Sequence, residues 1–158
     1  MTISLNPQSL ASRQGREFSD ESIRLTTRVG FVLRGQRVVF PECGVEVDLI
    51  IENQHGIAFF VECKGSFRDR PGLQRTDTLK KAIANMVLLD AVGIGPLLVL
   101  TSHRPVDGVG VAMLRVAQQA VPFEVLVPRD DYRRLSRLAV ATEFDLAGEG
   151  WNFRRRLV

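Results

Sequence analysis

Residues 45–64, VEVDLIIENQHGIAFFVECK, predict a β-hairpin. Two runs rich in β-branched and aromatic residues flank a polar segment, residues 53–56, that is typical of a turn. If the loop has three residues, it ends at Gly56, which can adopt the left-handed backbone that such loops need at their third position. We therefore expect a hairpin in which Asn53 pairs with Ile57.

This register decides where four charged side chains lie. Counting outward from the loop, Asp48 falls directly opposite Glu62, and Glu46 falls opposite Lys64. Because side chains alternate along a strand with a period of two, all four then share one face of the hairpin. A loop of two residues would instead place Asp48 and Glu62 on opposite faces. The candidate site therefore depends on the loop length.

Apolar residues surround these charges on both faces, which favours a sheet that is covered on both sides. A carboxylate or an ammonium in such a place costs several kcal/mol unless it is paired or bound to a metal. Two interpretations remain open, a cross-strand ion cluster and a site where two carboxylates hold a hard divalent cation beside a lysine. The opposite face is expected to carry Val45, Val47, Leu49, Ile51, Ile57, Phe59, Val61 and Cys63, and the charged face also carries Ile50, Ala58 and Phe60.

The spacing of the charged residues resembles that of a known family. Asp48, thirteen intervening residues and then Glu62-Cys63-Lys64-Gly65 are similar to the motif of the PD-(D/E)xK nuclease superfamily, which has the restriction-endonuclease-like fold. The resemblance covers about residues 15–127, with one departure, Val47 in the place of the usual proline. It implies a single α/β domain with an αβββαβ core, in which helices flank a mixed central sheet.

The resemblance also implies an activity, which is the Mg²⁺- or Mn²⁺-dependent hydrolysis of phosphodiester bonds in DNA by an endonuclease. Asp48, Glu62 and the backbone carbonyl of Cys63 would bind the metal. Lys64 would orient the attacking water or help to deprotonate it, and would neutralise charge in the transition state. An acidic residue of the first helix often completes the site in this family. Glu21 is the candidate here, and an ordinary solvated helix acid is the alternative.

The rest of the chain alternates between helical and strand patterns. Apolar residues at helical spacing predict a helix over residues 17–28, which Gly30 would end. Residues 31–40 predict a strand, or a bent pair of strands, next to the hairpin. The elements expected after the hairpin are a helix over 76–90 with Leu79, Ile83, Met86 and Val87 inward, a strand over 96–101, a helix over 107–119 with Val109, Met113 and Val116 inward, and a strand over 123–127.

The composition fits one globular domain, with 158 residues of which 45% are hydrophobic and 25% charged. We expect a flexible N-terminal segment at 1–14, the nuclease-like domain at 15–138 and a C-terminal extension at 139–158. No signal peptide and no apolar run of membrane-spanning length is present, which predicts a cytoplasmic protein. The two cysteines, Cys43 and Cys63, are expected to be unpaired, and two histidines give little support to a zinc site.

Basic residues gather just after the Glu62–Lys64 strand, where a loop and a helix should border the site. A net charge of +3 and a sequence pI of about 9.3 are compatible with a polyanionic partner. A solvated helix face explains Lys80 and Lys81 equally well. The segment 151–156, WNFRRR, either contacts nucleic acid or packs as a terminal or subunit contact. The candidates for phosphate binding are Arg68, Arg70, Arg75, Lys80 and Lys81.

Alternatives to the endonuclease remain open at this stage. A non-catalytic module of the same fold could bind nucleic acid or a partner protein, although the presence of Asp48, Glu62 and Lys64 together argues against it. A different hydrolase could use the same carboxylates on nucleotides. Cleavage of both DNA strands would need two sites, so a homodimer would suit a double-strand nuclease.

Overall fold

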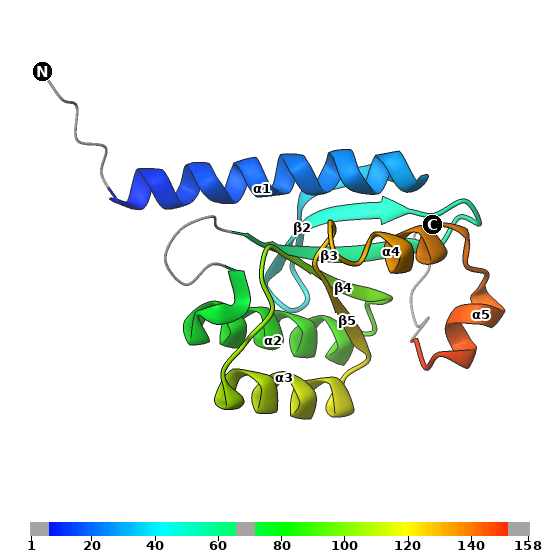
Figure 1. Cartoon of the computed structure of the whole chain (residues 1–158). Coiled ribbons are helices and arrows are strands. Elements are labelled where there is room, and N and C mark those ends of the chain that lie inside the picture. Colours follow the sequence, from blue (N-terminus) through cyan, green and yellow to red (C-terminus); the bar gives the residue numbers. More distant parts are fainter. Residues whose placement is uncertain (1–6, 66–71, 152–158) are drawn as a thin grey trace, which may run out of the picture.

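The computed structural model describes residues 7–65 and 72–151 and has a five-stranded sheet at its centre (Figure 1). The order of the strands in the sheet is the order in the chain, and β1, β2 and β3 form an antiparallel meander. β4 and β5 continue the sheet parallel to β3. The strands are β1 (Val32–Phe40), β2 (Val45–Glu52), β3 (Ala58–Lys64), β4 (Leu97–Thr101) and β5 (Phe123–Leu126).

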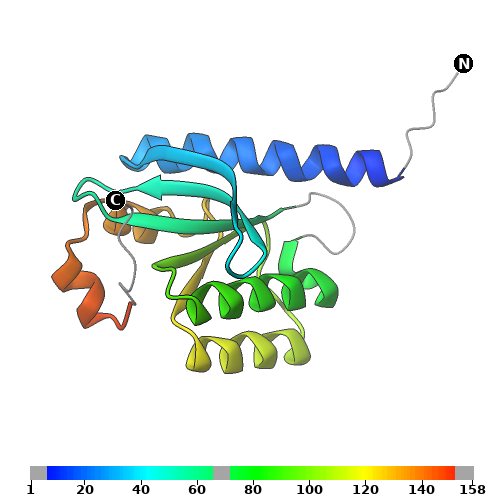
Figure 2. The same cartoon turned by 180° about the vertical axis from the view of Figure 1, so that it is seen from behind.

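Helices cover both faces of this sheet, as Figures 1 and 2 show. α1 and α4 lie on one face and belong to a core that includes Phe18 and Leu135, whereas α2 and α3 lie on the other with a core that includes Leu79 and Met86. The expected α/β class, a mixed central sheet flanked by helices, is confirmed. The helices are α1 (Pro7–Val29), the 3₁₀ turn η1 (Gly72–Gln74), α2 (Thr76–Ala91), α3 (Gly108–Ala120), α4 (Tyr132–Val140) and α5 (Glu143–Gly148).

The first helix is longer than its apolar pattern predicts. α1 begins at Pro7, inside the segment 1–14 that was expected to be flexible, and ends at Val29, where Gly30 follows with φ of +109°. Its first turns carry no apolar stripe, which is why periodicity does not find them. Among the helices that the structure describes, none has the length and apolarity needed to cross a membrane.

The C-terminal residues that the structure describes pack on the rest of the fold. α4 (Tyr132–Val140) continues across the boundary predicted between residues 138 and 139. The side-chain amide of Asn53 donates to the carbonyls of Leu138 and Ala141, at 3.0 and 2.8 Å. The hairpin loop and the end of α4 are thus joined through a buried polar side chain.

The inward faces of α2 and α3 match the prediction in part, because Leu79 and Met86 are buried and Met113 packs against the same core. In α3 the buried residues are Gly110 and Ala117, while Val109 and Val116 are 67% and 59% exposed. A Cβ on Gly110 would lie only 2.9 Å from the Pro105 side chain in the preceding loop and 3.6 Å from Leu79 of α2, so a larger residue is not accommodated at this inward position. The inward stripe of α2 is Leu79, Ala82, Met86 and Leu89, whereas Ile83 is half-buried and Val87 is exposed.

The hairpin register is the predicted one. Leu49 of β2 pairs with Val61 of β3, and the backbone N–H of Asn53 donates to the carbonyl of Ile57 at 2.9 Å. Gly56 has φ of +76°, the left-handed conformation expected at the third loop position. In this register Asp48 falls opposite Glu62.

β2 changes the face that it presents at Asp48. Leu49 and Ile51 pack in the core on the α1 side, as predicted, but Val45 and Val47 pack in the core on the α2 side. The ladder between β2 and β3 ends at Leu49, and Figure 2 shows the turn between β1 and β2 curving toward α2. Asp48 therefore lies at the point where β2 separates from β3.

Candidate active site

Asp48 fills a gap in the hairpin ladder. In an unbroken antiparallel ladder, the backbone N–H of Cys63 would donate to the carbonyl of Val47. Because β2 has turned away, this N–H instead donates to Oδ2 of Asp48 at 2.6 Å. The Asp48 carboxylate is thereby held against β3, beside Glu62.

Glu62 is the most deeply buried acid of the site, with 2% of its surface exposed. Its Oε1 accepts hydrogen bonds from the ammonium of Lys64 and from Nδ2 of Asn85 on α2, the latter at 3.1 Å. Its Oε2 is buried and has no hydrogen-bond partner within the described part of the chain. Burial raises the pKa of Glu62, the Lys64 charge opposes this effect and the Asp48 charge adds to it. One carboxylate oxygen is thus desolvated and unsatisfied.

Lys64 reaches this carboxylate from the end of β3. Its ammonium forms an ion pair with Glu62, and 22% of its side chain is exposed. The predicted position of Glu46 opposite Lys64 is not realised, because β2 has left β3 before that point; Glu46 pairs with Arg37 at 3.0 Å instead. Among the described residues, Lys64 therefore pairs with Glu62 and not with Glu46.

Cys63 presents its thiol and its carbonyl to different neighbours. The half-buried side chain packs in the core on the α1 side, where burial raises the pKa of the thiol. The carbonyl of Lys64 accepts the N–H of Ser102, directly after β4, so the backbone polar groups of Lys64 face β4. Because these groups point to alternate sides along a strand, the N–H and C=O of Cys63 face β2. This side is the one on which Asp48 lies. Cys43 and Cys63 are both free, as predicted.

These groups fit a hard divalent cation. Glu62 has a buried oxygen without a partner, the Asp48 carboxylate lies beside it, and the Cys63 carbonyl is on the same side of β3. Such an all-oxygen donor set suits Mg²⁺ or Mn²⁺. No cluster of three or more His, Cys, Asp and Glu side chains occurs in the described ranges, so water would have to supply further ligands.

Glu21 is not brought to this site. Its carboxylate accepts a hydrogen bond from Nε of Arg129 at 2.6 Å and lines a cavity of about 260 Å³ between α1 and the loops after β4 and β5. α1 covers the face of the sheet opposite α2, whereas Glu62 contacts Asn85 on α2 (Figure 1). The expectation that Glu21 completes the metal site is therefore not met in this structure.

The basic residues lie on α2 or outside the described residues. Arg68 and Arg70 fall in residues 66–71, which the structure does not describe. Arg75, Lys80 and Lys81 are exposed at the start of α2. Lys81 precedes Asn85 by four residues, so the two share one face of the helix, and Lys80 is turned about 100° away. Of the three, Lys81 is on the face that borders the cluster.

Asn85 is a site residue that the sequence analysis missed. Its position in the run AIANMVLL, residues 82–89, is the only polar one. A polar side chain in the middle of an apolar helical run needs a partner, and here the partner is Glu62. This isolated polarity was the available signal, but a contact with a particular strand cannot be read from it.

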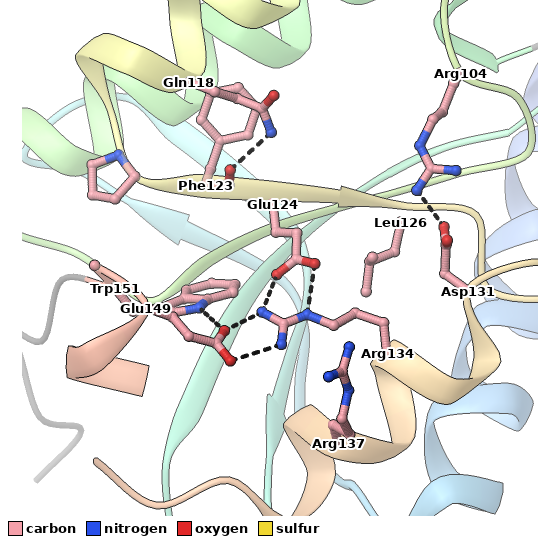
Figure 3. Close-up of a pocket in the computed structure, with 12 residues that line it drawn as sticks. Arg104, Gln118, Phe123, Glu124, Leu126, Asp131, Arg134, Arg137, Glu149 and Trp151 are labelled. Carbon is pink, nitrogen blue, oxygen red and sulfur yellow. Dashed lines mark hydrogen bonds and ion pairs between the residues drawn. The ribbon is translucent and has the colours of Figure 1, made fainter. Parts of the chain in front are cut away.

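A separate cavity of about 710 Å³ lies between β5, α4 and Trp151 (Figure 3). Arg134 spans it, donating to both oxygens of Glu124 at 2.8 Å and also to Glu149. Arg104 at its edge pairs with Asp131 at 2.5 Å. Three arginines and three acids line the cavity, and none of the predicted site residues does. The arrangement braces the C-terminal segment against the sheet.

Comparisons with known proteins give few matches. No protein-family model matches the chain, and no curated protein matches it. A chain in the solved "Structure of EndoMS-dsDNA2 complex" is similar, with 11% sequence identity and a TM-score of 0.46. The match covers 81% of this chain and 48% of that chain, so this protein spans about half the length of that one. A likeness of this degree says nothing about activity, which has to be argued from the site.

Proposed function

We propose that the protein is a Mg²⁺-dependent endonuclease that hydrolyses phosphodiester bonds in DNA. The observation that carries this proposal is the cluster of Asp48, Glu62 and Lys64 with a buried, unpaired oxygen on Glu62. A structural ion cluster would be expected to satisfy that oxygen, because an unpartnered charged group inside a protein is costly. A cation that joins the site would remove this cost.

Asp48, Glu62 and the carbonyl of Cys63 would hold the metal, and Mn²⁺ would serve in its place. The bound metal supplies a water of lowered pKa and positive charge next to the phosphate. Asp48 is already oriented by the Cys63 N–H, and Glu62 by Asn85, so both carboxylates are fixed before any ligand arrives.

Lys64 supplies the second positive charge. Without metal, its ammonium neutralises one oxygen of Glu62. With substrate present, it orients the attacking water and neutralises the charge that develops on the phosphate oxygens. Its partial exposure leaves it accessible to a phosphate, unlike Glu62.

Basic side chains next to the cluster would hold the DNA backbone. Arg75, Lys80 and Lys81 are exposed at the start of α2, and Arg68 and Arg70 precede them in the chain. Contacts of this kind bind phosphates without reading bases, so we propose binding to DNA with little sequence preference from these residues.

The test is cleavage of plasmid and duplex oligonucleotide DNA with Mg²⁺ or Mn²⁺. Asp48→Asn and Glu62→Gln should abolish cleavage and weaken Mn²⁺ binding, measured by calorimetry. Lys64→Ala should retain Mn²⁺ binding and lose roughly two orders of magnitude in rate, because one positioned charge is worth about 3 kcal/mol. Glu46→Gln is the matched control, since Glu46 is an exposed acid of β2 paired with Arg37. Equal turnover in all four variants would refute the proposal.

A second candidate is a non-catalytic module of the same fold. The Lys64–Glu62 ion pair and the Asn85 hydrogen bond are what such a module would keep as a structural cluster. This candidate predicts DNA or protein binding without cleavage, and no effect of Mg²⁺ on the thermal unfolding of the protein. Thermal unfolding with and without Mg²⁺ therefore separates the two candidates before any substrate is known.

A further inference from the structure

Thr101, the last residue of β4, is fully buried and contacts the backbone of Lys64. Its Oγ1 donates a hydrogen bond to the carbonyl of Lys64 at 2.8 Å. The same carbonyl accepts the N–H of Ser102 at 3.2 Å, which is the last rung of the ladder between β3 and β4. The shorter of the two bonds to the Lys64 carbonyl thus comes from a side chain.

The hydroxyl of Thr101 also contacts two further backbone segments, the loop that follows β4 at His103 and the start of η1 at Gly72. Oγ1 accepts the N–H of His103 at 3.3 Å, and the His103 carbonyl accepts the N–H of Leu73 at 3.0 Å. A Cβ on Gly72 would lie 2.6 Å from Oγ1, so the returning chain packs directly on this hydroxyl. The hydroxyl has one hydrogen to donate, and two carbonyls are within reach, that of Lys64 at 2.8 Å and that of His103 at 3.0 Å. The hydrogen is assigned to the closer one, the Lys64 carbonyl.

The end of β3 needs this support because it has lost its other neighbour. β2 pairs with β3 only as far as Val61, so no ladder from β2 holds Lys64. Strand ends open more readily than strand centres, and Lys64 is the last residue of β3. Within the described residues, the hydrogen bonds to the Lys64 carbonyl come from Thr101 and Ser102, at the end of β4.

We propose that Thr101 is the positioning residue for Lys64, fixing the peptide of Lys64 so that its ammonium is held at the Asp48–Glu62 cluster. The proposal rests on the proposed function, in which Lys64 is catalytic. Thr101 touches neither substrate nor metal in this scheme. It acts only through the carbonyl of Lys64, and its hydroxyl is the group that matters.

The test compares Thr101→Val, which keeps the shape and removes the hydroxyl, with Thr101→Ser, which keeps the hydroxyl. In Mg²⁺-dependent cleavage of an end-labelled DNA duplex, Thr101→Val should lower kcat about ten- to a hundredfold with KM nearly unchanged, because small displacements of a catalytic group cost this much. Thr101→Ser should restore kcat to within about threefold of the parent. Thr26→Val is the control, since Thr26 is a buried threonine of α1 whose hydroxyl donates to a helix carbonyl. An unchanged kcat in Thr101→Val, or an equal loss in Thr101→Ser, would overturn the proposal.

A second measurement separates this proposal from the proposed function. NMR relaxation of the Lys64 Cε and Nζ should report a more mobile side chain in Thr101→Val than in the parent, with Thr101→Ser resembling the parent, whether or not DNA is cleaved. If the parent protein cleaves no DNA but these mobilities differ as expected, the proposed function fails and the positioning contact stands. If Lys64 is equally ordered in all three proteins, the positioning role is wrong even in an active enzyme.

Discussion

Nδ2 of Asn85 on α2 lies 3.1 Å from Oε1 of Glu62 on β3, and this bond joins a helix to the buried acid of the candidate site. The amide favours the charged form of Glu62 and so lowers a pKa that burial raises. Asn85→Ala should raise the pKa of Glu62 further. Mn²⁺ binds the deprotonated carboxylate. As the pH is lowered, the affinity for Mn²⁺ should therefore begin to fall at a higher pH in Asn85→Ala than in the parent.

Calorimetric titration of Mn²⁺ at a series of pH values measures this shift. Asn53→Ala is unsuitable as a control because Asn53 braces the hairpin loop, and Gln119→Ala on the exposed surface of α3 is the better choice. Identical pH profiles for Asn85→Ala and the parent would mean that Asn85 does not set the charge of Glu62.

The raised pKa of Glu62 also predicts how stability depends on pH. A carboxyl whose pKa is higher in the folded than in the unfolded state binds its proton more tightly when folded. Without metal, the folded protein should therefore gain stability from Glu62 as pH falls through its folded-state pKa, and lose that contribution as pH rises. Glu62→Gln should remove this dependence and raise the melting temperature by a few degrees at neutral pH.

Chemical denaturation of the parent and of Glu62→Gln across pH, with a chelator present, tests this point. Added Mg²⁺ should reverse the order, because it stabilises only the protein that binds it. A variant less stable than the parent at neutral pH would show that the Lys64 pair outweighs the cost of burial.

Gly65 is expected to tolerate no side chain. A Cβ at this position would lie 1.9 Å from Cγ of Phe18, a buried residue of α1. Gly65→Ala should destabilise the protein by about 1–3 kcal/mol through overpacking at the end of the candidate catalytic strand. Gly108→Ala, at the start of α3 with nothing within 4 Å, should be neutral or mildly stabilising. Urea unfolding measures both, and a Gly65→Ala protein as stable as the parent would contradict the contact.

Lys81 should contribute more to DNA binding than its neighbour Lys80. Both are exposed, but Lys81 shares a helix face with Asn85 and hence with the site. Removing one phosphate contact should reduce the magnitude of the slope of log K against log salt by about 0.7 to 0.9. Binding of one oligonucleotide at several salt concentrations, by Lys81→Ala, Lys80→Ala and Arg133→Ala, measures this slope. Arg133 lies on α4, on the other face of the sheet. An equal change of slope in Arg133→Ala would mean that the DNA contacts are not concentrated near the candidate site.

The sequence carries most of the information on the sheet and on the central cluster. The three-residue loop that ends at Gly56 sets the pairing of β2 with β3, and this register together with the bond from the Cys63 N–H places Asp48 beside Glu62. Local turn chemistry was sufficient here because one glycine conformation determines the register of every residue in the hairpin.

The errors come from contacts between distant segments. The bend of β2 moves Glu46 away from Lys64, and nothing in the alternating pattern of β2 indicates that the strand will turn. In α3 the buried residues are Gly110 and Ala117 in place of the predicted Val109 and Val116, and hydrophobicity does not report the close packing at Gly110. Glu21 was the candidate that the family resemblance implied, but the loop after β5 supplies Arg129 as its partner, and that loop is remote in the sequence.

The Asp48 carboxylate takes the place of one backbone acceptor in the β2–β3 ladder, and this affects which divalent ion the candidate site can bind. The two strands are hydrogen-bonded from Leu49 to the hairpin loop, and Oδ2 of Asp48 is bonded to the N–H of Cys63, so the Asp48 carboxylate has little freedom to move away from β3. Ca²⁺ is larger than Mg²⁺ and needs more ligands at longer distances. We therefore expect selection by ionic radius, with Ca²⁺ admitted poorly and acting as a weak competitor of Mg²⁺.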